Sequence, residues 1–366
     1  MKNKTGVYIH VPYCVRKCVY CDFYSITDRS SEKDYVDALC RHFELRSKEN
    51  ADRTVDTVFF GGGTPSLLSP ESFKTIMSAL RCFYDIRNDA EITVEANPAT
   101  LSEDKLSAFI SCGVNRISVG FQSAIDSELK LLARIHGKQD FFDTYRLIRD
   151  SGLKNVNIDL MYGIPEQTLS SLSDSLAAVA MLKPEHVSVY GLKIEPESYL
   201  GKHTEEFSLP DDELQCEMYK YISNTLSEYG YVRYEFSNFA KPGFECRHNL
   251  KYWQREEYLG FGPAASSFVG KTRYTYTRDL RAYIDRINRG IEPDQSEYCE
   301  ITGRDVENER IMLGLRLSQG IAADDLLLSK SRKFIDGGFM SVKGNRLCLT
   351  DEGILVSNYI LSELIN

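Results

Sequence analysis

Three of the ten cysteines lie within one segment of eight residues near the N-terminus. Cys14, Cys18 and Cys21 have the spacing C-x3-C-x2-C, whereas the other cysteines are scattered singly along the chain. A structural zinc site needs a fourth ligand, and a bacterial ferredoxin-type run needs a fourth cysteine followed by proline; the sequence supplies neither. Three thiolates on a four-iron cluster leave one iron with an open coordination position. The spacing therefore predicts a [4Fe-4S] cluster that can bind a further ligand.

A glycine-rich turn and several single polar residues follow other apolar runs. Gly61–Gly63 come directly after the run that ends at Phe60, and they lack the Gly-Lys-Ser/Thr ending of a P-loop and the spacing of a dinucleotide fingerprint. Phosphate binding is therefore not predicted, and taken alone the glycines indicate a tight turn. Glu95, Gln122 and Asp159 each lie at or just past the end of a short apolar run.

The elements that must position these residues alternate between strand-like and helix-like segments. The strand-like runs are Gly6–Val11, Val55–Phe60, Glu91–Glu95, Arg116–Phe121, Val156–Leu160 and His186–Leu192. The helical segments between them are Glu32–Lys48, Ser69–Tyr84, Ser102–Cys112, Gln139–Ser151 and Thr168–Leu182. This alternation predicts an α/β fold with a parallel sheet, either doubly wound or a barrel. Because the polar residues gather at the C-terminal ends of the strands, we favour a partial (β/α)6 barrel.

The chain changes character after a capped helix near Asp211–Glu228. We expect a barrel domain over residues 1–230, an aromatic-rich connecting region over 231–300 and a smaller C-terminal α+β module over 301–366. The last of these reads as helices around a hairpin, which resembles a winged helix. Packing or partner docking is its simplest role.

Composition and charge exclude several classes of function. The chain has 366 residues, 42% of them apolar, and its 44 basic and 53 acidic residues give a net charge of −9 without a long run of like charges. A general binder of nucleic acid or anionic membranes is therefore disfavoured. No window approaches the roughly 18 uninterrupted apolar residues of a spanning helix, and the N-terminus leaves no room for a signal peptide. We expect a cytoplasmic protein without stable membrane insertion.

Together, the cysteine loop and its neighbours resemble the radical S-adenosylmethionine superfamily. The segments Tyr8-x-His10-x-Pro12 and Phe59–Pro65 narrow the resemblance to the oxygen-independent coproporphyrinogen III oxidase-like group. The resemblance implies that the open iron binds the amino and carboxylate groups of S-adenosylmethionine. One electron from the reduced cluster then cleaves this cosubstrate to methionine and a 5′-deoxyadenosyl radical.

The same resemblance implies two ligand positions beside the cluster. The S-adenosylmethionine site would involve Tyr8, Gly62 and Glu95. A second ligand position would involve Tyr20, Gly63, Thr64, Gln122, Arg134 and Asp159.

Two departures separate the chain from the oxidase itself. Phe23 stands where the oxidase has an additional cysteine, and the oxidase's N-terminal extension before Tyr8 is missing. Instead, His248-Asn-x-x-Tyr-Trp253 resembles the signature of the haem chaperone branch of this group, whose members bind haem and deliver it to haem-dependent proteins. The motif also has the chemistry that haem requires, namely an axial ligand, flat aromatic surface and cations for the propionates. The candidates for these roles are His248 or Cys246; Tyr252 and Trp253; and Arg247, Lys251 or Arg255.

The leading prediction is a cluster-bearing haem chaperone with haem as cargo, and two alternatives stay open. The first is oxygen-independent coproporphyrinogen III oxidation or another radical reaction on a tetrapyrrole. The second is a scaffold that carries a cluster without catalysis. The partners that the resemblance implies are haem, haem-accepting proteins such as respiratory enzymes, and an electron donor, and it also allows a homodimer. A nucleic-acid partner is not expected.

Overall fold

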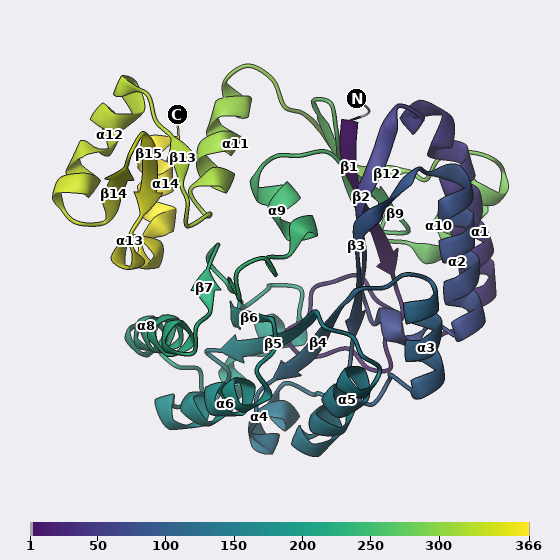
Figure 1. Ribbon diagram of the computed structural model, residues 1–366, viewed down its shortest axis with the longest axis horizontal. Coiled ribbons are helices and arrows are strands. Elements are labelled where there is room, and N and C mark those ends of the chain that lie inside the picture. Colours follow the sequence, from purple (N-terminus) through teal and green to yellow (C-terminus); the bar gives the residue numbers. More distant parts are fainter. Residues whose placement is uncertain (1–2, 366) are drawn as a thin grey trace.

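Twelve strands form one continuous sheet in the computed structural model, which describes residues 3–365 (Figure 1). Their order across the sheet is β12-β11-β10-β9-β1-β2-β3-β4-β5-β6-β8-β7. The strands β1 to β6 pair in parallel and match the six predicted runs. Their bounds are β1 Asn3–Val11, β2 Arg53–Gly62, β3 Ile86–Ala96, β4 Arg116–Gln122, β5 Val156–Tyr162 and β6 His186–Gly191.

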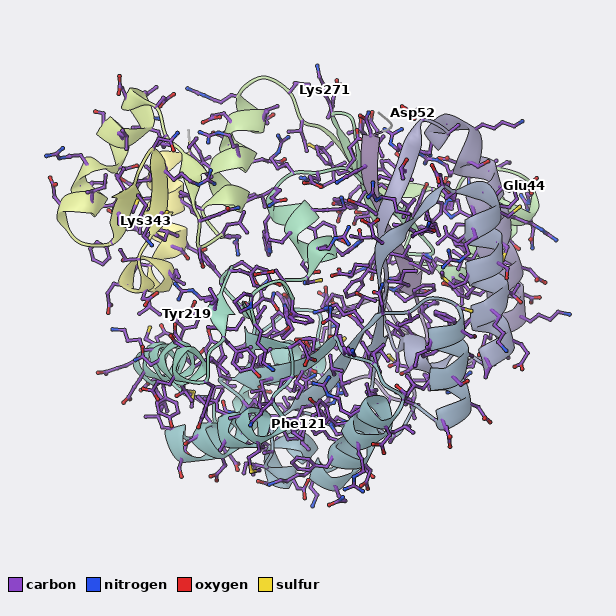
Figure 2. All side chains as sticks on the ribbon, viewed as in Figure 1. Glu44, Asp52, Phe121, Tyr219, Lys271 and Lys343 are labelled. Carbon is purple, nitrogen blue, oxygen red and sulfur yellow. The ribbon has the colours of Figure 1, made fainter. Side chains whose placement is uncertain are left out.

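Helices cover the outer face of the parallel strands (Figure 1). The five predicted helices are confirmed within a residue or two at each end. Ser69 and Ser102, the first residues of two predicted segments, occupy N-cap positions, and each side chain accepts a backbone N–H from the first turn. The helices of this half are α1 Glu32–Ser47, α2 Pro70–Phe83, α3 Glu103–Ser111, α4 Asp126–Leu131, α5 Lys138–Asp150, α6 Leu169–Leu182, α7 Tyr199–Lys202 and α8 Asp212–Glu228. Short 3-10 turns lie at Lys48–Asn50, Pro65–Leu67 and Thr204–Glu206. Figure 2 shows how densely side chains fill the layer between sheet and helices; Phe121 of β4, for example, stacks on Phe141 of α5 with ring centroids 3.8 Å apart.

The inner face of the six parallel strands surrounds a cavity. Each strand sends at least one side chain into it: Tyr8, Phe59, Glu95, Ser118, Asp159 and Ser188. Since residues from the first and the sixth strand line the same space, the sheet is curved into the partial barrel that the sequence predicts.

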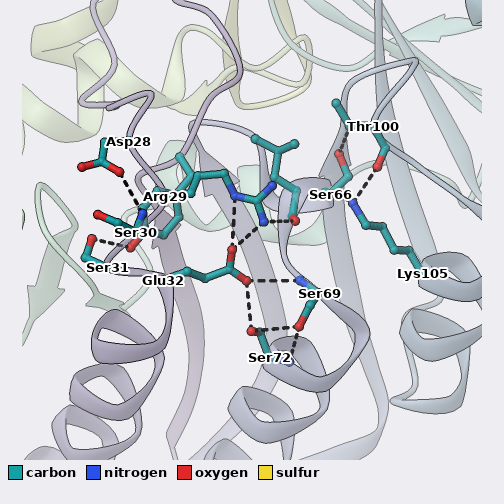
Figure 3. Close-up of polar contacts among 12 residues, drawn as sticks. Asp28, Arg29, Ser30, Ser31, Glu32, Ser66, Ser69, Ser72, Thr100 and Lys105 are labelled. Carbon is teal, nitrogen blue, oxygen red and sulfur yellow. Dashed lines mark hydrogen bonds and ion pairs between the residues drawn. The ribbon is translucent and has the colours of Figure 1, made fainter.

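A polar network fixes the segment that follows the glycine-rich turn (Figure 3). The Glu32 carboxylate accepts the Ser69 backbone N–H at 3.3 Å and the Ser72 hydroxyl at 3.0 Å. On the other side, the Lys105 ammonium donates to the Ser66 carbonyl at 2.7 Å, and the hydroxyls of Ser66 and Thr100 lie 2.6 Å apart. These bonds join α1, α2 and α3 to the turn, so the chain after Thr64 has a defined path.

Residues 231–300 extend the sheet on both sides and add two helices. The hairpin β7 and β8 lies beside β6, and β9 pairs in parallel with β1 before β10, β11 and β12 continue antiparallel. The bounds are β7 Val232–Arg233, β8 Asn238–Ala240, α9 Arg247–Trp253, β9 Tyr258–Phe261, β10 Ser266–Val269, β11 Thr272–Tyr276, α10 Leu280–Asn288 and β12 Gln295–Glu300. The motif that begins at His248 forms most of helix α9, and Cys246 occupies the N-cap position of this helix.

The C-terminal residues form a second, smaller core around a three-stranded antiparallel sheet. The order helix, helix, hairpin, helix agrees with the winged-helix-like pattern. The elements are α11 Arg304–Gly314, β13 Ile321–Ala322, α12 Asp325–Asp336, β14 Met340–Lys343, β15 Arg346–Leu349, α13 Asp351–Leu355 and α14 Ser357–Leu364. Among the residues described, no helix has the length and apolar character needed to cross a membrane.

Candidate functional site

All thirteen residues that the sequence predicts for the site line one cavity of about 670 Å³ inside the partial barrel. A volume of this size lies in the range of small-molecule and cofactor sites. The thirteen residues are Tyr8, Cys14, Cys18, Tyr20, Cys21, Gly62, Gly63, Thr64, Glu95, Gln122, Arg134, Asp159 and His248. These thirteen residues span 240 positions of the sequence, from Tyr8 to His248.

Backbone hydrogen bonds hold the cysteine loop across the C-terminal ends of the strands. The Cys14 N–H donates to the Ile26 carbonyl at 2.9 Å, and the Thr64 N–H donates to the Tyr13 carbonyl at 2.7 Å. Farther along the loop, the Val19 N–H donates to the Leu132 carbonyl at 3.3 Å. The loop is therefore tied to the turn after β2 and to the end of α4.

The three thiols suit a multi-iron cluster better than a single ion. All three are free, and they do not form a three-ligand group within the 4.8 Å that would suit one metal ion. Hydrogen-bond donors already face two of them, since the Thr64 hydroxyl lies 3.5 Å from the Cys14 sulfur and Arg134 donates to the Cys18 sulfur at 3.5 Å. Burial raises the pKa of the Cys21 thiol to about 11, so bound metal is needed to keep it as a thiolate.

The glycine-rich turn passes very close to the protein's own chain. Gly62 has φ +107°, and a Cβ there would lie 2.6 Å from a ring carbon of His10. A Cβ on Gly63 would lie 2.6 Å from the carbonyl oxygen of Tyr13. The absence of side chains is thus required by packing against β1 and the start of the cysteine loop, whatever ligand the turn also accommodates.

Tyr8, His10 and Glu95 occupy the wall formed by β1 and β3. The Nε2 atom of His10 donates to the Tyr24 carbonyl at 2.8 Å, which leaves Nδ1 to accept the Tyr8 hydroxyl at 3.1 Å. Burial and the nearby Asp159 raise the pKa of Glu95 to about 8, although a hydrogen bond from the Gly62 backbone opposes the shift. At neutral pH the Glu95 carboxyl is therefore mostly protonated, and a bound cation would favour its ionised form.

The residues predicted for a second ligand position line the same cavity, and three of them, Gln122, Asp159 and Arg134, come from β4, β5 and the segment after α4. Gln122 ends β4 with φ +67°, a left-handed conformation that non-glycine residues rarely adopt and that often marks functional sites. Arg134 bridges the Cys18 sulfur and the Gly120 carbonyl, at 3.5 and 3.2 Å. Asp159 accepts hydrogen bonds from neighbouring side chains of β4 and β5, while burial raises its pKa.

Helix α9 closes the other end of the cavity. The His248 ring stacks on Phe59 at 5.2 Å, its Nδ1 lies 2.8 Å from the Thr57 hydroxyl, and its Nε2 lies 2.8 Å from the Tyr252 hydroxyl. Burial lowers the pKa of His248 to about 3, so the ring is neutral. Both nitrogens are therefore engaged, and an iron could reach Nε2 only by replacing the Tyr252 hydroxyl.

Of the other predicted haem contacts of this motif, Tyr252 lines the cavity, whereas the rest do not. Cys246 is fully buried with its sulfur 3.6 Å from Glu91, and burial raises its pKa to about 12, so a thiolate ligand there is wrong. The predicted propionate cations are also wrong, because each already binds within the protein. Lys251 pairs with Asp56 and Glu256, Arg255 pairs with Glu309, and Arg247 donates to the carbonyls of Asp56 and Asp89. Trp253 does not line the cavity; its ring packs under Arg316, just past α11.

Sequence reasoning missed several residues that line the cavity. Arg116 lies in β4, Asn249 in α9 and Tyr190 in β6, and Arg278 lies near the cysteine loop, where it pairs with Asp22. Two of them carried a signal: Arg116 is the one charged residue in the otherwise uncharged strand β4, and Asn249 belongs to the motif His248-Asn-x-x-Tyr-Trp253. The others stand in segments whose placement depends on long-range packing.

Comparison with known proteins adds three findings. The model of the radical SAM superfamily matches residues 8–179, and that of the HemN C-terminal domain matches residues 301–356. The heme chaperone HemW of Bacillus subtilis is 34% identical over 98% of this chain and 99% of its own length, and that of Escherichia coli is 40% identical over 82% and 78%. The structure of coproporphyrinogen III oxidase (HemN) from Escherichia coli superimposes on this chain with a TM-score of 0.86 and 23% sequence identity. The superposition covers 100% of this chain and 90% of the oxidase chain, which establishes the common fold.

Proposed function

The chain belongs to the HemW family of radical SAM proteins, and from this we propose that it binds haem and delivers it to haem-dependent proteins. The match over almost the full length of a relative named as a heme chaperone is the observation that carries the proposal. The identity with the oxidase is too low to transfer its activity, and Phe23 stands in place of the oxidase's additional cysteine.

We propose that Cys14, Cys18 and Cys21 hold a [4Fe-4S] cluster. When bound, the cluster would supply an electron and an open iron for S-adenosylmethionine. Tyr8, Gly62 and Glu95 would surround this cosubstrate, and the protonated Glu95 would ionise next to its sulfonium. A second ligand position would involve Tyr20, Gly63, Thr64, Gln122, Arg134 and Asp159, which line the same cavity; it is proposed on the resemblance alone.

Haem would occupy the part of the cavity that faces α9. Among the cavity-lining residues that the structure describes, His248 carries the one imidazole, so it is our proposed axial ligand. The bond between Nδ1 and Thr57 supports this role, because histidines that bind a metal through one nitrogen usually hold the other in a hydrogen bond. Ligation through Nε2 would replace the bond to Tyr252.

The partners follow from the same proposal. Haem-accepting proteins would receive the cargo, and an electron donor would reduce the cluster. Arg16 and Lys17 lie exposed between Cys14 and Cys18, which favours a donor with an acidic surface.

The test is an anaerobic titration of the reconstituted protein with haemin, with and without S-adenosylmethionine. We expect a saturable shift of the haem absorption band, followed by transfer of haem from the loaded protein to an apo haem protein. In a parallel incubation, coproporphyrinogen III with S-adenosylmethionine and a reductant should yield no protoporphyrinogen IX. Robust decarboxylation, or the lack of any haem binding, would overturn the proposal.

A further inference from the structure

Arg116 is a buried cation without a bonded partner. Its side chain is 2% exposed, lines the cavity and makes no hydrogen bond or ion pair with any described residue. The Nε atom is buried without a hydrogen-bond partner. By contrast, the buried Arg46 bonds to two tyrosine hydroxyls, and the buried Lys251 pairs with Asp56 at 2.8 Å.

An unpaired guanidinium in the protein interior is costly, because it has lost water without gaining a bonded anion. Glu91 and Asp159 interact with Arg116 electrostatically without a hydrogen bond, and their carboxylate oxygens already accept hydrogen bonds from other groups. Glu91 accepts the backbone N–H groups of Arg247 and His248, and Asp159 accepts from Ser118 at 3.0 Å. The N–H groups of Arg116 are therefore available to a ligand that enters the cavity.

The chemistry of the site favours a carboxylate. The guanidinium fork can donate two parallel hydrogen bonds to a carboxylate, and arginine remains protonated at every relevant pH. Asn249 also lines this part of the cavity, and its side-chain amide has no bonded partner among the described residues. A fixed positive charge beside a free amide donor suits one carboxylate group.

The position of Arg116 distinguishes between two sources of that carboxylate. Arg116 begins β4 and Gln122 ends it, so Arg116 lies about 20 Å along the strand from the cluster end. The amino-acid end of an S-adenosylmethionine bound to the cluster would lie with the cysteine loop, at the far end of the cavity. A tetrapyrrole above α9 would bring its propionates toward Arg116.

We propose that Arg116, with Asn249, binds a propionate carboxylate of haem. This inference rests on the proposed haem function, and it replaces the propionate contacts that Arg247, Lys251 and Arg255 are unable to provide. Arg116 anchors the edge of the macrocycle, while His248 lies beneath the same part of the cavity.

The experiment compares haemin with haemin dimethyl ester, whose propionates carry no charge. The wild-type protein should bind haemin about tenfold more tightly than the ester, as expected for one charge-assisted pair. Arg116→Met should lower haemin affinity about tenfold and leave ester affinity unchanged, so that the preference disappears, while Arg116→Lys should keep part of it. Arg46→Met, which removes a buried arginine outside the cavity, should keep the full preference.

The outcomes separate the inference from the function on which it rests. If the wild-type protein binds haemin and its ester equally well, the inference is overturned even if the Arg116 variants fail to fold. If Arg116→Met keeps the preference, or loses S-adenosylmethionine binding instead, the propionate assignment is also overturned and haem binding stands. If the wild-type protein binds neither porphyrin, the proposed function itself fails.

Discussion

The two ends of the cavity differ in how far their polar groups are already bonded within the protein. At the cluster end, three thiols are free, and Gln122 is held in a left-handed conformation. At the α9 end, His248 uses both ring nitrogens and Lys251 contacts two carboxylates. The cysteines at the first end can bind a ligand without breaking a bond within the protein, whereas His248 and its neighbours at the second end are part of the packed floor of the cavity. A ligand at the floor must compete with bonds that already exist.

The largest effect should follow from removal of the three cluster thiols. Replacing Cys14, Cys18 and Cys21 by alanine should abolish the iron and sulfide that the protein retains after anaerobic reconstitution, because no other cysteine among the described residues lines the cavity. Metal analysis and the cluster absorption band give the readout.

Single variants of Cys40, Cys82 and Cys216 are the controls for this prediction, since none of them lines the cavity. They should retain iron and sulfide at wild-type levels. Four irons per chain in the triple variant would show that the cluster is held elsewhere.

His248→Ala tests whether the floor is a structural element as well as a binding surface. The change leaves the Thr57 and Tyr252 hydroxyls without their partner and creates a cavity against Phe59, so unfolding free energy should fall by about 2 to 4 kcal/mol. Urea unfolding measures the loss. His203→Ala, at a half-exposed histidine outside the cavity, should change stability by much less, about 0.5 kcal/mol.

Tyr252→Phe sharpens the same comparison, because it removes the hydroxyl that competes for Nε2 and keeps the ring. If His248 is the axial ligand, haemin affinity should rise about fivefold, the equivalent of one hydrogen bond. An unchanged haem band in both His248→Ala and Tyr252→Phe would limit His248 to a structural role.

The smallest effect concerns the pH dependence that Glu95 contributes. Its pKa is about 8 in the folded chain and 4.5 when unperturbed, so the folded state keeps a proton that the unfolded state releases. Wild-type stability should therefore fall as the pH rises through this window and stay level above it. The unfolding free energy of Glu95→Gln should not fall in this way. Relative to wild type, it should rise by on the order of 1 to 2 kcal/mol between about pH 5 and 8, after allowance for water in the cavity.

Urea unfolding at several pH values measures the difference for Glu95→Gln. Glu103→Gln, at an exposed position in the first turn of α3, should run parallel to the wild type. A parallel curve for Glu95→Gln as well would show that Glu95 titrates normally.

The parts of the fold that local signals encode could be predicted from the sequence. The six parallel strands follow apolar runs, and Ser69 and Ser102 mark helix starts through their own hydroxyls. The strand ends placed Glu95, Gln122 and Asp159 at one mouth. The cluster cysteines could be recognised because one loop contains all three.

The floor of the cavity could not be predicted, because it depends on contacts between distant segments. Helix α9 has seven residues and no side-chain cap of its own, so its sequence resembles a loop. Its cap comes from Glu91 of β3, whose carboxylate accepts the N–H groups of Arg247 and His248 at 3.1 and 3.0 Å. Likewise, the charge of Arg116 became meaningful only when its missing partners could be seen.

The remote cap of α9 also sets the order of events during synthesis. Glu91 leaves the ribosome 157 residues before His248, so the barrel walls can assemble while the floor is still absent. Until Trp253 has been synthesised and α9 has docked on β3, the floor of the cavity is missing. The three cysteines and the glycine-rich turn precede α9 in the chain, so the two ends of the cavity are synthesised at different times. The residues proposed for the cluster and the proposed haem ligand would therefore enter the cavity at different stages of synthesis.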